Sequence, residues 1–432
     1  MRKTGLPQSN FFAAKYNCNK INGAIKGTAI RRINLRSLFS GSIPFFILAH
    51  LAHHVVTALP VPLLPFIRDE FALDYTRSGL IISVFGIVYG ASQLPAGWLA
   101  DRIGPRILIT ISISGVALCG LLIGLSQTYL MLIILLIVMG VLGGGYHPVS
   151  AAMISAVVEP RNLGRALGFH MIGGSIAYFL IPPIAAVIAA ALGWRSPFIL
   201  LAIPAIIFGV VFHMLLRRQE FTKITKSKTA SSYAEIKQNA RRLRHVIVIL
   251  IPSTFSQAAL LSVAAFMPLY LVDYFGTSKE MAAASMAFIY SAGLWAGPVG
   301  GYLSDRWGRL LILFITCFGA GVIFYLLNLT PYGLGTVAIL VILGIIMYIN
   351  TTVAQAHIVD HTPEYYRSTI LGIYFFGALE GNGVLMPVIG YLIDKFGFHS
   401  SFTITGVAVV VVTLVSLAIL QISRDQPPVE QQ

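Results

Sequence analysis

Charged residues are scarce in this chain. Only 11% of its 432 residues are charged and 56% are hydrophobic, whereas soluble globular domains carry about 25% charged residues. A soluble domain of this size could not hide so much apolar surface from water. The composition therefore excludes an ordinary soluble protein and predicts that lipid surrounds most of the chain.

Cysteines and acidic residues are also few. Cys18, Cys119 and Cys317 stand at unrelated spacings, which give neither a disulfide framework nor a metal-binding pattern. We expect no cofactor and no metal. The net charge of +14 could indicate nucleic-acid binding, but no aromatic residues interleave with the basic clusters to stack on bases. We therefore expect no nucleic-acid partner.

Long apolar segments dominate the sequence. A helix that spans a bilayer needs about 20 apolar residues. Twelve segments meet this requirement: 41–66, 79–100, 107–126, 129–157, 166–191, 197–216, 246–272, 281–303, 310–328, 334–358, 368–393 and 401–422. The sequence therefore predicts an all-α polytopic membrane protein with twelve transmembrane helices.

Lys and Arg are distributed unevenly between the connections. With the N-terminus inside, 25 of the 30 fall on the cytoplasmic side, mostly in the tail 1–40 and the loop 217–245, and five fall on the other side. Basic residues concentrate on the cytoplasmic side of membrane proteins. We therefore expect the protein to lie in a cell membrane, with both termini, including the tail 423–432, in the cytoplasm.

The N-terminal tail permits a second interpretation. It contains no acidic residue, because the first in the chain is Asp69. An acid-free, Arg-bearing N-terminus is typical of organelle transit peptides as well as of cytoplasmic anchors. An organelle membrane and a cleaved targeting segment remain the alternative.

An internal repeat runs at a constant offset of 204 residues. The segment GWLADRIG at 97–104 recurs as GYLSDRWG at 301–308, and the same shift carries Gly193 onto Gly397 and Pro183 onto Pro387. Parallel repeats with a binding site between them near the bilayer midplane are a recognised transporter plan. The sequence thus predicts two six-helix bundles, 41–216 and 246–422, joined by the loop 217–245.

The repeated loop resembles the signature loop of the major facilitator superfamily. This resemblance implies twelve helices in two pseudo-symmetric bundles, a monomer that moves a small molecule by alternating access, and no enzymatic activity. In the family the loop braces the cytoplasmic side of the outward-facing state. The resemblance implies such a conformational-switch role for Gly97, Asp101, Arg102, Gly104, Arg106, Asp305, Arg306, Gly308 and Arg309.

Two departures separate the chain from the usual proton antiporters of that family. Gly140 stands in the fourth segment where those proteins usually have Arg, and the Gly-Pro signature of the fifth segment is missing. Drug–proton antiport of the usual kind is therefore not favoured.

Ionisable residues inside the apolar segments are functional candidates, because each is costly in lipid. Glu380 lies midway along segment 368–393. Burial favours the neutral form of a carboxyl group, which suits a group that takes up and releases a proton. Contact with a cationic substrate, or a protonated carboxyl bonded to a neighbouring helix, are the alternatives.

Three histidines share one face of the first segment. His50, His53 and His54 fall within an arc of about 100°, together with Thr57. Imidazoles relay protons near neutral pH, so His50 and His54 are further proton-coupling candidates. Hydrogen bonding to neighbouring helices is the alternative.

His50 and His54, with Tyr146-His147-Pro148, also resemble the fosmidomycin-resistance-type exporters of the superfamily. His54 and Val149 replace two acids of that pattern, so the resemblance extends only to His50 and His147. In the family, segments one, four, seven and ten line the cavity. This implies substrate-cavity roles for His50, His53, Tyr146, His147, Gln257, Asn350 and Gln355.

The expected function is proton-coupled export of a small neutral or cationic, partly apolar compound, because no Lys or Arg lies inside a segment to bind an anion. Proton-coupled uptake of a small metabolite is the alternative. The spacing His50-x-x-His53-His54 also matches one histidine box of membrane di-iron enzymes, but those enzymes need several boxes. A channel or transporter-like receptor is a further remote alternative.

Overall fold

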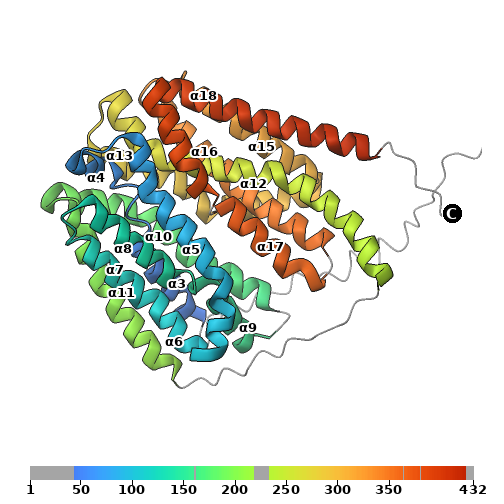
Figure 1. The fold of residues 1–432 in the computed structure, drawn as a ribbon, viewed down its shortest axis with the longest axis horizontal. Helices are drawn as coiled ribbons and strands as arrows, with labels where there is room; N and C mark the ends of the chain where they lie inside the picture. The colour runs from blue at the N-terminus through green and yellow to red at the C-terminus, as the bar shows by residue number, and fades with distance from the viewer. Residues whose placement is uncertain (1–42, 160–161, 218–232, 363, 380, 425–432) are drawn as a thin grey trace, which may run out of the picture. The chain divides into compact units, whose positions relative to one another are not determined.

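The computed structural model describes residues 43–159, 162–217, 233–362, 364–379 and 381–424. Every regular element in these ranges is helical (Figure 1). The tails 1–40 and 425–432, most of the predicted loop 217–245, and Glu380 lie outside the described residues.

Among its described residues, the first half contains nine α-helices and one π-helical turn. They are α3 (Ile43–Thr57), α4 (Leu64–Phe71), α5 (Tyr75–Ile103), α6 (Pro105–Thr110), the π turn η1 (Ile111–Gly115), α7 (Val116–Ile123), α8 (Tyr129–Gly143), α9 (Tyr146–Val157), α10 (Leu163–Leu192) and α11 (Arg195–Leu216).

In the part of the second half that the structure describes, there are seven α-helices and one 3₁₀ turn. They are α12 (Tyr233–Phe275), α13 (Lys279–Ser291), the 3₁₀ turn η3 (Ala292–Leu294), α14 (Ala296–Trp307), α15 (Arg309–Leu327), α16 (Leu334–His361), α17 (Glu364–Leu379) and α18 (Asn382–Arg424). Helix α12 begins inside the loop predicted at 217–245.

All twelve predicted segments coincide with helices. Among the described residues, nine helices are long and apolar enough to cross a membrane, and the bent pair α13–η3 and α14 makes ten. One of these spans, 370–421, covers two predicted segments, with non-helical backbone at Gly397. The shorter apolar helix α3 covers another. The fold is therefore the predicted polytopic α-helical one.

The first predicted segment, 41–66, is not one continuous span. Helix α3 ends at Thr57 and α4 begins at Leu64. Pro60 and Pro62 lie in this interval, and proline cannot donate the backbone hydrogen bond that would continue a helix. The fourth segment counts as one span, 129–157, although a short turn at Gly144 and Gly145 separates α8 from α9.

The two halves repeat the same local devices at the 204-residue offset. Gly104 and Gly308 have φ of 90° and 97°, and Gly193 and Gly397 have φ of 83° and 73°. The side chains of Asp74 and Ser278 cap α5 and α13 by accepting hydrogen bonds from the amides of Arg77 and Met281, as N-cap residues do. The two halves therefore share these local features at equivalent positions.

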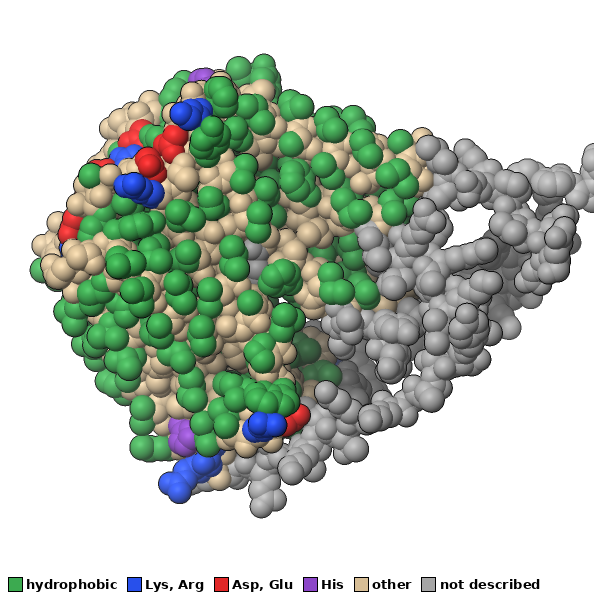
Figure 2. Space-filling model, in the orientation of Figure 1, with side chains coloured by type: hydrophobic (Ala, Val, Ile, Leu, Met, Phe, Trp, Pro, Cys, Tyr) green, Lys and Arg blue, Asp and Glu red, His purple; other side chains and the backbone are tan. Residues whose placement is uncertain are grey.

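Apolar side chains cover the outside as well as the core. Leu94, Val187 and Leu334 are 78%, 72% and 89% exposed, and hydrophobic side chains cover the visible face between two charged ends (Figure 2). Continuous apolar surface of this kind marks contact with lipid or a partner. The core between the halves forms where α5 packs on α18 and α10 on α13.

Candidate functional site

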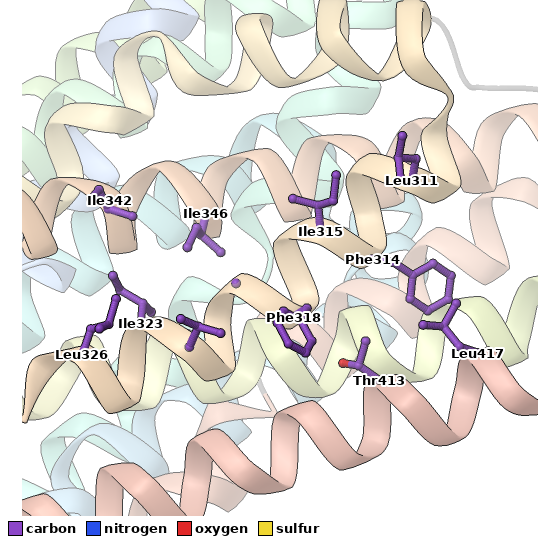
Figure 3. Close-up of a pocket in the computed structure, with 12 residues that line it drawn as sticks. Leu311, Phe314, Ile315, Phe318, Ile323, Leu326, Ile342, Ile346, Thr413 and Leu417 are labelled. Carbon is purple, nitrogen blue, oxygen red and sulfur yellow. The ribbon is translucent and has the colours of Figure 1, made fainter.

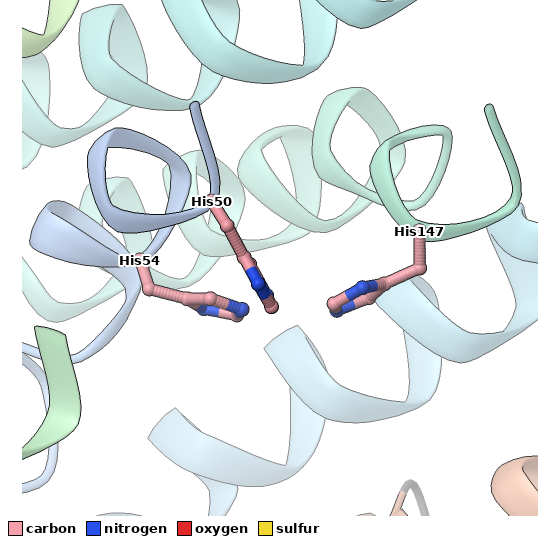
Figure 4. Close-up of side chains that lie close together, drawn as sticks. All are labelled: His50, His54 and His147. Atoms are coloured by element: carbon pink, nitrogen blue, oxygen red, sulfur yellow. The ribbon is translucent and has the colours of Figure 1, made fainter. Parts of the chain in front are cut away.

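Three histidine side chains converge inside the first half. His50 and His54 project from α3, and His147 projects from the first turn of α9 toward them (Figure 4). Their nearest ring nitrogens all lie within 4.8 Å of one another. His50 and His54 are buried and His147 is half-buried. This group, which we call the histidine cluster, joins the predicted segments 41–66 and 129–157.

Hydrogen bonds at Nδ1 orient the rings of His50 and His54. His50 Nδ1 lies 2.8 Å from the backbone oxygen of His170, and His54 Nδ1 lies 3.0 Å from Thr57 Oγ1. A carbonyl oxygen only accepts hydrogen bonds, so His50 Nδ1 carries the proton and Nε2 carries a lone pair. His50 Nε2 has no hydrogen-bond partner in the described structure.

His53 and Tyr146 serve the packing around this cluster. His53 Nδ1 lies 2.9 Å from the backbone oxygen of Ser112, and its Nε2 lies 3.0 Å from the Tyr89 hydroxyl. Both ring nitrogens are therefore engaged. Tyr146 stacks on His53 with ring centroids 4.2 Å apart. His170, the neighbour of His50, bonds the backbone oxygen of Phe46 at 3.0 Å.

The candidates of the second half lie in a different environment. Asn350 on α16 accepts a hydrogen bond from Ser253 at 2.8 Å and donates to Thr316 at 3.2 Å. Gln257 on α12 is buried, and its Oε1 has no partner in the described structure. Gln355 is half-buried. Asn350 thus ties three helices together.

The signature loop lies at the end of α5. Gly104 ends α5 and begins α6 with φ 90° and ψ 140°, a conformation almost confined to glycine. Arg102 lies over the Trp98 ring, 4.0 Å from its centroid. Asp101 and Arg106 make no ion pair with any described residue.

The second copy of this loop is held by ion pairs. Arg309 binds Asp305 at 2.9 Å and also pairs with Asp360 at the end of α16. Gly308 makes the same turn as Gly104, with φ 97° and ψ 136°, and Arg306 is exposed. We call the end of the molecule that holds both turns the motif end.

Polar contacts join the two halves at the opposite end. Arg68 pairs with Asp273, with one nitrogen–oxygen distance of 3.0 Å, and Lys279 pairs with Asp69 at 2.5 Å. We call these two ion pairs, with the Asp394 contacts described next, the latch.

Asp394 on α18 completes the latch. Its carboxylate accepts hydrogen bonds from the backbone amides of Tyr75 and Thr76, both at 2.9 Å. These amides belong to the first turn of α5, where backbone N–H groups lack partners within the helix and the helix dipole favours a negative charge. A residue of one half thereby caps a helix of the other.

Glycine surroundings distinguish the two ends. A Cβ added to Gly79 would lie 2.8 Å from the backbone oxygen of Met386 in the other half. One added to Gly390 would lie 2.5 Å from the backbone oxygen of Tyr75. At the motif end, a Cβ on Gly97 or Gly372 would meet no atom of the described residues within 4 Å. The halves are thus in close contact at Gly79 and Gly390, whereas a Cβ at Gly97 or Gly372 would meet no described neighbour.

Sequence reasoning missed the latch. Its basic members, Arg68 and Lys279, belong to the five Lys and Arg predicted on the far side, which counted only toward topology. Their rarity there is the signal that could have drawn attention to them. Arg195, from the same set, pairs with Glu70 at 2.6 Å.

One apolar groove lies on the lipid-facing side and not between the halves (Figure 3). It has a volume of about 570 Å³ and is lined by α15, α16 and α18, including Phe314, Phe318 and Ile346. Leu311 and Ile315 on its wall are among the exposed apolar side chains. The groove contains none of the predicted site residues.

Comparison with known proteins identifies the chain. The model of the Major Facilitator Superfamily matches residues 46–379 and 336–432. The probable sulfoacetate transporter of Cupriavidus necator is 28% identical over 383 residues, which cover 82% of this chain and 87% of that protein. The multidrug resistance protein MdtG of Proteus mirabilis is 30% identical over 267 residues, 60% of this chain and 66% of that one.

A solved structure shows the same fold. The crystal structure of a POT family transporter in complex with a thioalcohol-conjugated peptide superposes with a TM-score of 0.73 at 14% identity, covering 90% of this chain and 98% of that one. These similarities are to transporters and not to enzymes such as the membrane di-iron class. The chain belongs to the major facilitator superfamily, as a multi-pass membrane protein that transports a small molecule.

Proposed function

We propose that this protein is a monomeric, proton-linked exporter of a small neutral or cationic, partly apolar organic compound, working by alternating access. The observation that carries the proposal is the one-sided contact between the halves. They are tied together at the latch, while Gly97 and Gly372 at the motif end face open space. Two bundles that close at one end and part at the other can expose a central site to each side in turn.

The charge distribution supports the proposed substrate class. Within the described helices, Arg and Lys side chains such as Arg68, Arg102 and Arg309 lie near helix ends. A fixed cation at mid-depth is the usual means of holding an anion in lipid-surrounded protein. A neutral or cationic compound needs no such group.

Proton coupling is assigned to Glu380, by sequence alone. Its position midway along segment 368–393 makes it the acid with the greatest predicted depth in the membrane. A carboxyl group there exchanges a costly charge for a neutral form by taking a proton. Orientation with both termini in the cytoplasm of a cell is proposed on the Lys and Arg distribution.

Uptake of a small organic anion is the second candidate. The similarity to the sulfoacetate transporter favours it, because that relative aligns with most of both chains. The charge distribution favours the first candidate, and a flux measurement separates the two.

The test uses purified protein in proteoliposomes with an imposed pH gradient. A panel of lipophilic amines and short sulfonates and carboxylates is screened in both gradient directions. We expect amines to move against the proton flow. Sulfonates moving with the protons would establish the second candidate, and flux that does not respond to the gradient would overturn proton coupling.

The coupling residue is tested with Glu380→Gln, with Glu280→Gln at the start of α13 as a matched control. We expect Glu380→Gln to abolish gradient-driven accumulation while substrate exchange without a gradient persists. Glu280→Gln should leave both intact. Full proton-driven accumulation by the Glu380→Gln protein would reject the assignment.

A further inference from the structure

We propose that the histidine cluster binds a divalent first-row transition-metal ion. His50 and His54 are four residues apart on α3, which places both rings on one helix face, and His147 reaches them from α9 (Figure 4). The ring centroids lie 4.9 Å apart for His50 and His54, and 5.2 Å and 5.6 Å from His147. This gives His50 and His54 a role different from the proton relay expected from sequence.

The hydrogen bonds behind the rings suit metal ligation. A metal-binding imidazole commonly donates its other N–H to a backbone carbonyl or a similar acceptor, which fixes its orientation and the position of its lone pair. His50 has this arrangement, with Nδ1 2.8 Å from the His170 oxygen. His50 is 1% exposed, and its Nε2 has no hydrogen-bond partner in the described structure. A buried nitrogen without a partner is unfavourable unless something binds it.

The donor set selects the class of ion. Three neutral imidazoles suit Zn²⁺, Co²⁺, Ni²⁺ or Cu²⁺, whereas Ca²⁺ and Mg²⁺ require oxygen ligands. Three protein ligands leave a coordination position for water or another small ligand. Zn–N bonds of 2.0–2.1 Å separate the nitrogens of a tetrahedral site by about 3.3 Å, so the rings must move closer than their present limit of 4.8 Å.

The surroundings supply no negative charge to the bound ion. The neighbouring ionisable groups are all ring side chains. His53, His170 and Tyr146 contact the cluster from α3, α10 and α9, Tyr178 on α10 contacts His54, and Tyr89 on α5 contacts His147. No Asp, Glu or Cys of the described chain belongs to the cluster. We therefore expect a small anion in the open coordination position to strengthen binding.

The experiment is a Co²⁺ titration of the full-length protein in detergent, carrying an affinity tag without histidines. Four- or five-coordinate Co²⁺ gives intense visible absorption bands that octahedral aqueous Co²⁺ lacks. We expect these bands to saturate at one ion per chain and to disappear when Zn²⁺ is added. Chloride or acetate should lower the concentration needed for saturation.

Two variants at the half-buried position assign the ligand. His147→Ala should weaken binding by about 10-fold or more, a loss of the size seen when even outer groups of metal sites are removed. His147→Cys retains a ligand, and a thiolate bound to Co²⁺ should add a near-ultraviolet charge-transfer band. The band identifies residue 147 as a ligand if the unchanged protein, which also contains Cys18, Cys119 and Cys317, lacks it.

The matched control is the pair His357 and His361 on α16. These rings are also four residues apart, with centroids at 4.1 Å, but no third ligand joins them among the described residues. His357→Ala with His361→Ala should leave the titration unchanged. Octahedral bands only, unchanged binding by His147→Ala, or loss of binding in the control would each overturn the metal site, without bearing on the transport assay.

Discussion

At the residue scale, two glycines make the turns of the motif end possible. Gly104 and Gly308 have φ of 90° and 97°. A side chain in such a conformation costs about 1–3 kcal/mol. We expect Gly104→Ala to lower the thermal unfolding temperature of the purified protein, measured by intrinsic fluorescence.

Gly97→Ala is the control for that change. Gly97 lies inside α5, and its added Cβ would meet nothing within 4 Å. Alanine is favoured over glycine in a helix by about 1 kcal/mol, so stability should stay equal or rise. An equal loss from both variants would show that the backbone conformation is not the cause.

The histidines show how much of the site the sequence could provide. Their spacing predicted that His50, His53 and His54 share one face of a helix. In the structure their partners differ. His53 forms hydrogen bonds with Ser112 and Tyr89, whereas His50 and His54 lie close to His147. Local spacing cannot reveal this difference, because the partners lie on helices distant in sequence.

At the element scale, one helix crossing occurs twice. The Cβ position of Gly140 on α8 lies 3.0 Å from the Phe85 oxygen on α5, and that of Gly344 on α16 would overlap the Ile289 oxygen on α13. The offset of 204 relates Gly140 to Gly344 and Phe85 to Ile289. Small residues allow helix backbones to approach closely in membranes.

We expect Gly344→Ala to destabilise the protein more than Gly140→Ala, because the added methyl group has less room at Gly344. Forcing a methyl group into a packed site costs about 1–3 kcal/mol. Thermal unfolding in detergent measures both variants. Equal stability of Gly344→Ala and the unchanged protein would show that the α13–α16 crossing adjusts freely.

Element existence was predictable and element continuity was not. Hydropathy located all twelve segments because lipid demands about 20 apolar residues for each span. The breaks between α3 and α4 and between α8 and α9 fall at Pro60 and Pro62 and at the Gly143–Gly145 run, which a count of apolar residues does not distinguish. Apolar content is the same on both sides of such a break.

At the scale of the whole molecule, the latch joins the two halves. Asp273 is bound by Arg68 and by the Tyr75 hydroxyl at 2.7 Å. Hydrogen bonds to charged groups contribute about 1.5–3 kcal/mol. We expect Asp273→Asn to raise the population separated at the latch about tenfold, measured as a distance distribution between spin labels on α4 and α13.

Asp101→Asn serves as the opposing control. If the signature loop braces the other conformation, this change should favour the latched state and shift the same distribution the opposite way. Asp305→Asn removes a pair within one half and should shift it less than Asp273→Asn. Identical distributions for Asp273→Asn and the unchanged protein would remove the latch from the mechanism.

The latch should also respond to acid. Burial tends to raise the pKa of Asp69, but hydrogen bonds from Lys279 and Arg68 outweigh it and hold the pKa below its usual range. A carboxyl with a depressed pKa stabilises the latched state above its ordinary pKa of about 4, and this contribution is lost as the pH falls through the depressed value. The label distances should lengthen below about pH 4, and Asp69→Asn should remove part of this dependence.

The repeat, the motif and the family were predictable because they reside in the sequence itself. The latch was not, since its pairs join residues such as Arg68 and Asp273, which lie 205 residues apart and in different halves. Charge counting treated each as a topological signal and could not anticipate a partner in the other half.

The Asp394 contacts make separation of the two halves measurable by hydrogen exchange. Because this carboxylate of the second half protects the first amides of α5, separating the halves leaves Tyr75 and Thr76 N–H groups open to solvent. Deuterium should enter these two amides only during such excursions. Their exchange rates would then report how often the halves separate at this end, in a protein without labels or substitutions. A transported compound that changes this frequency would alter the exchange rates, without any measurement of flux.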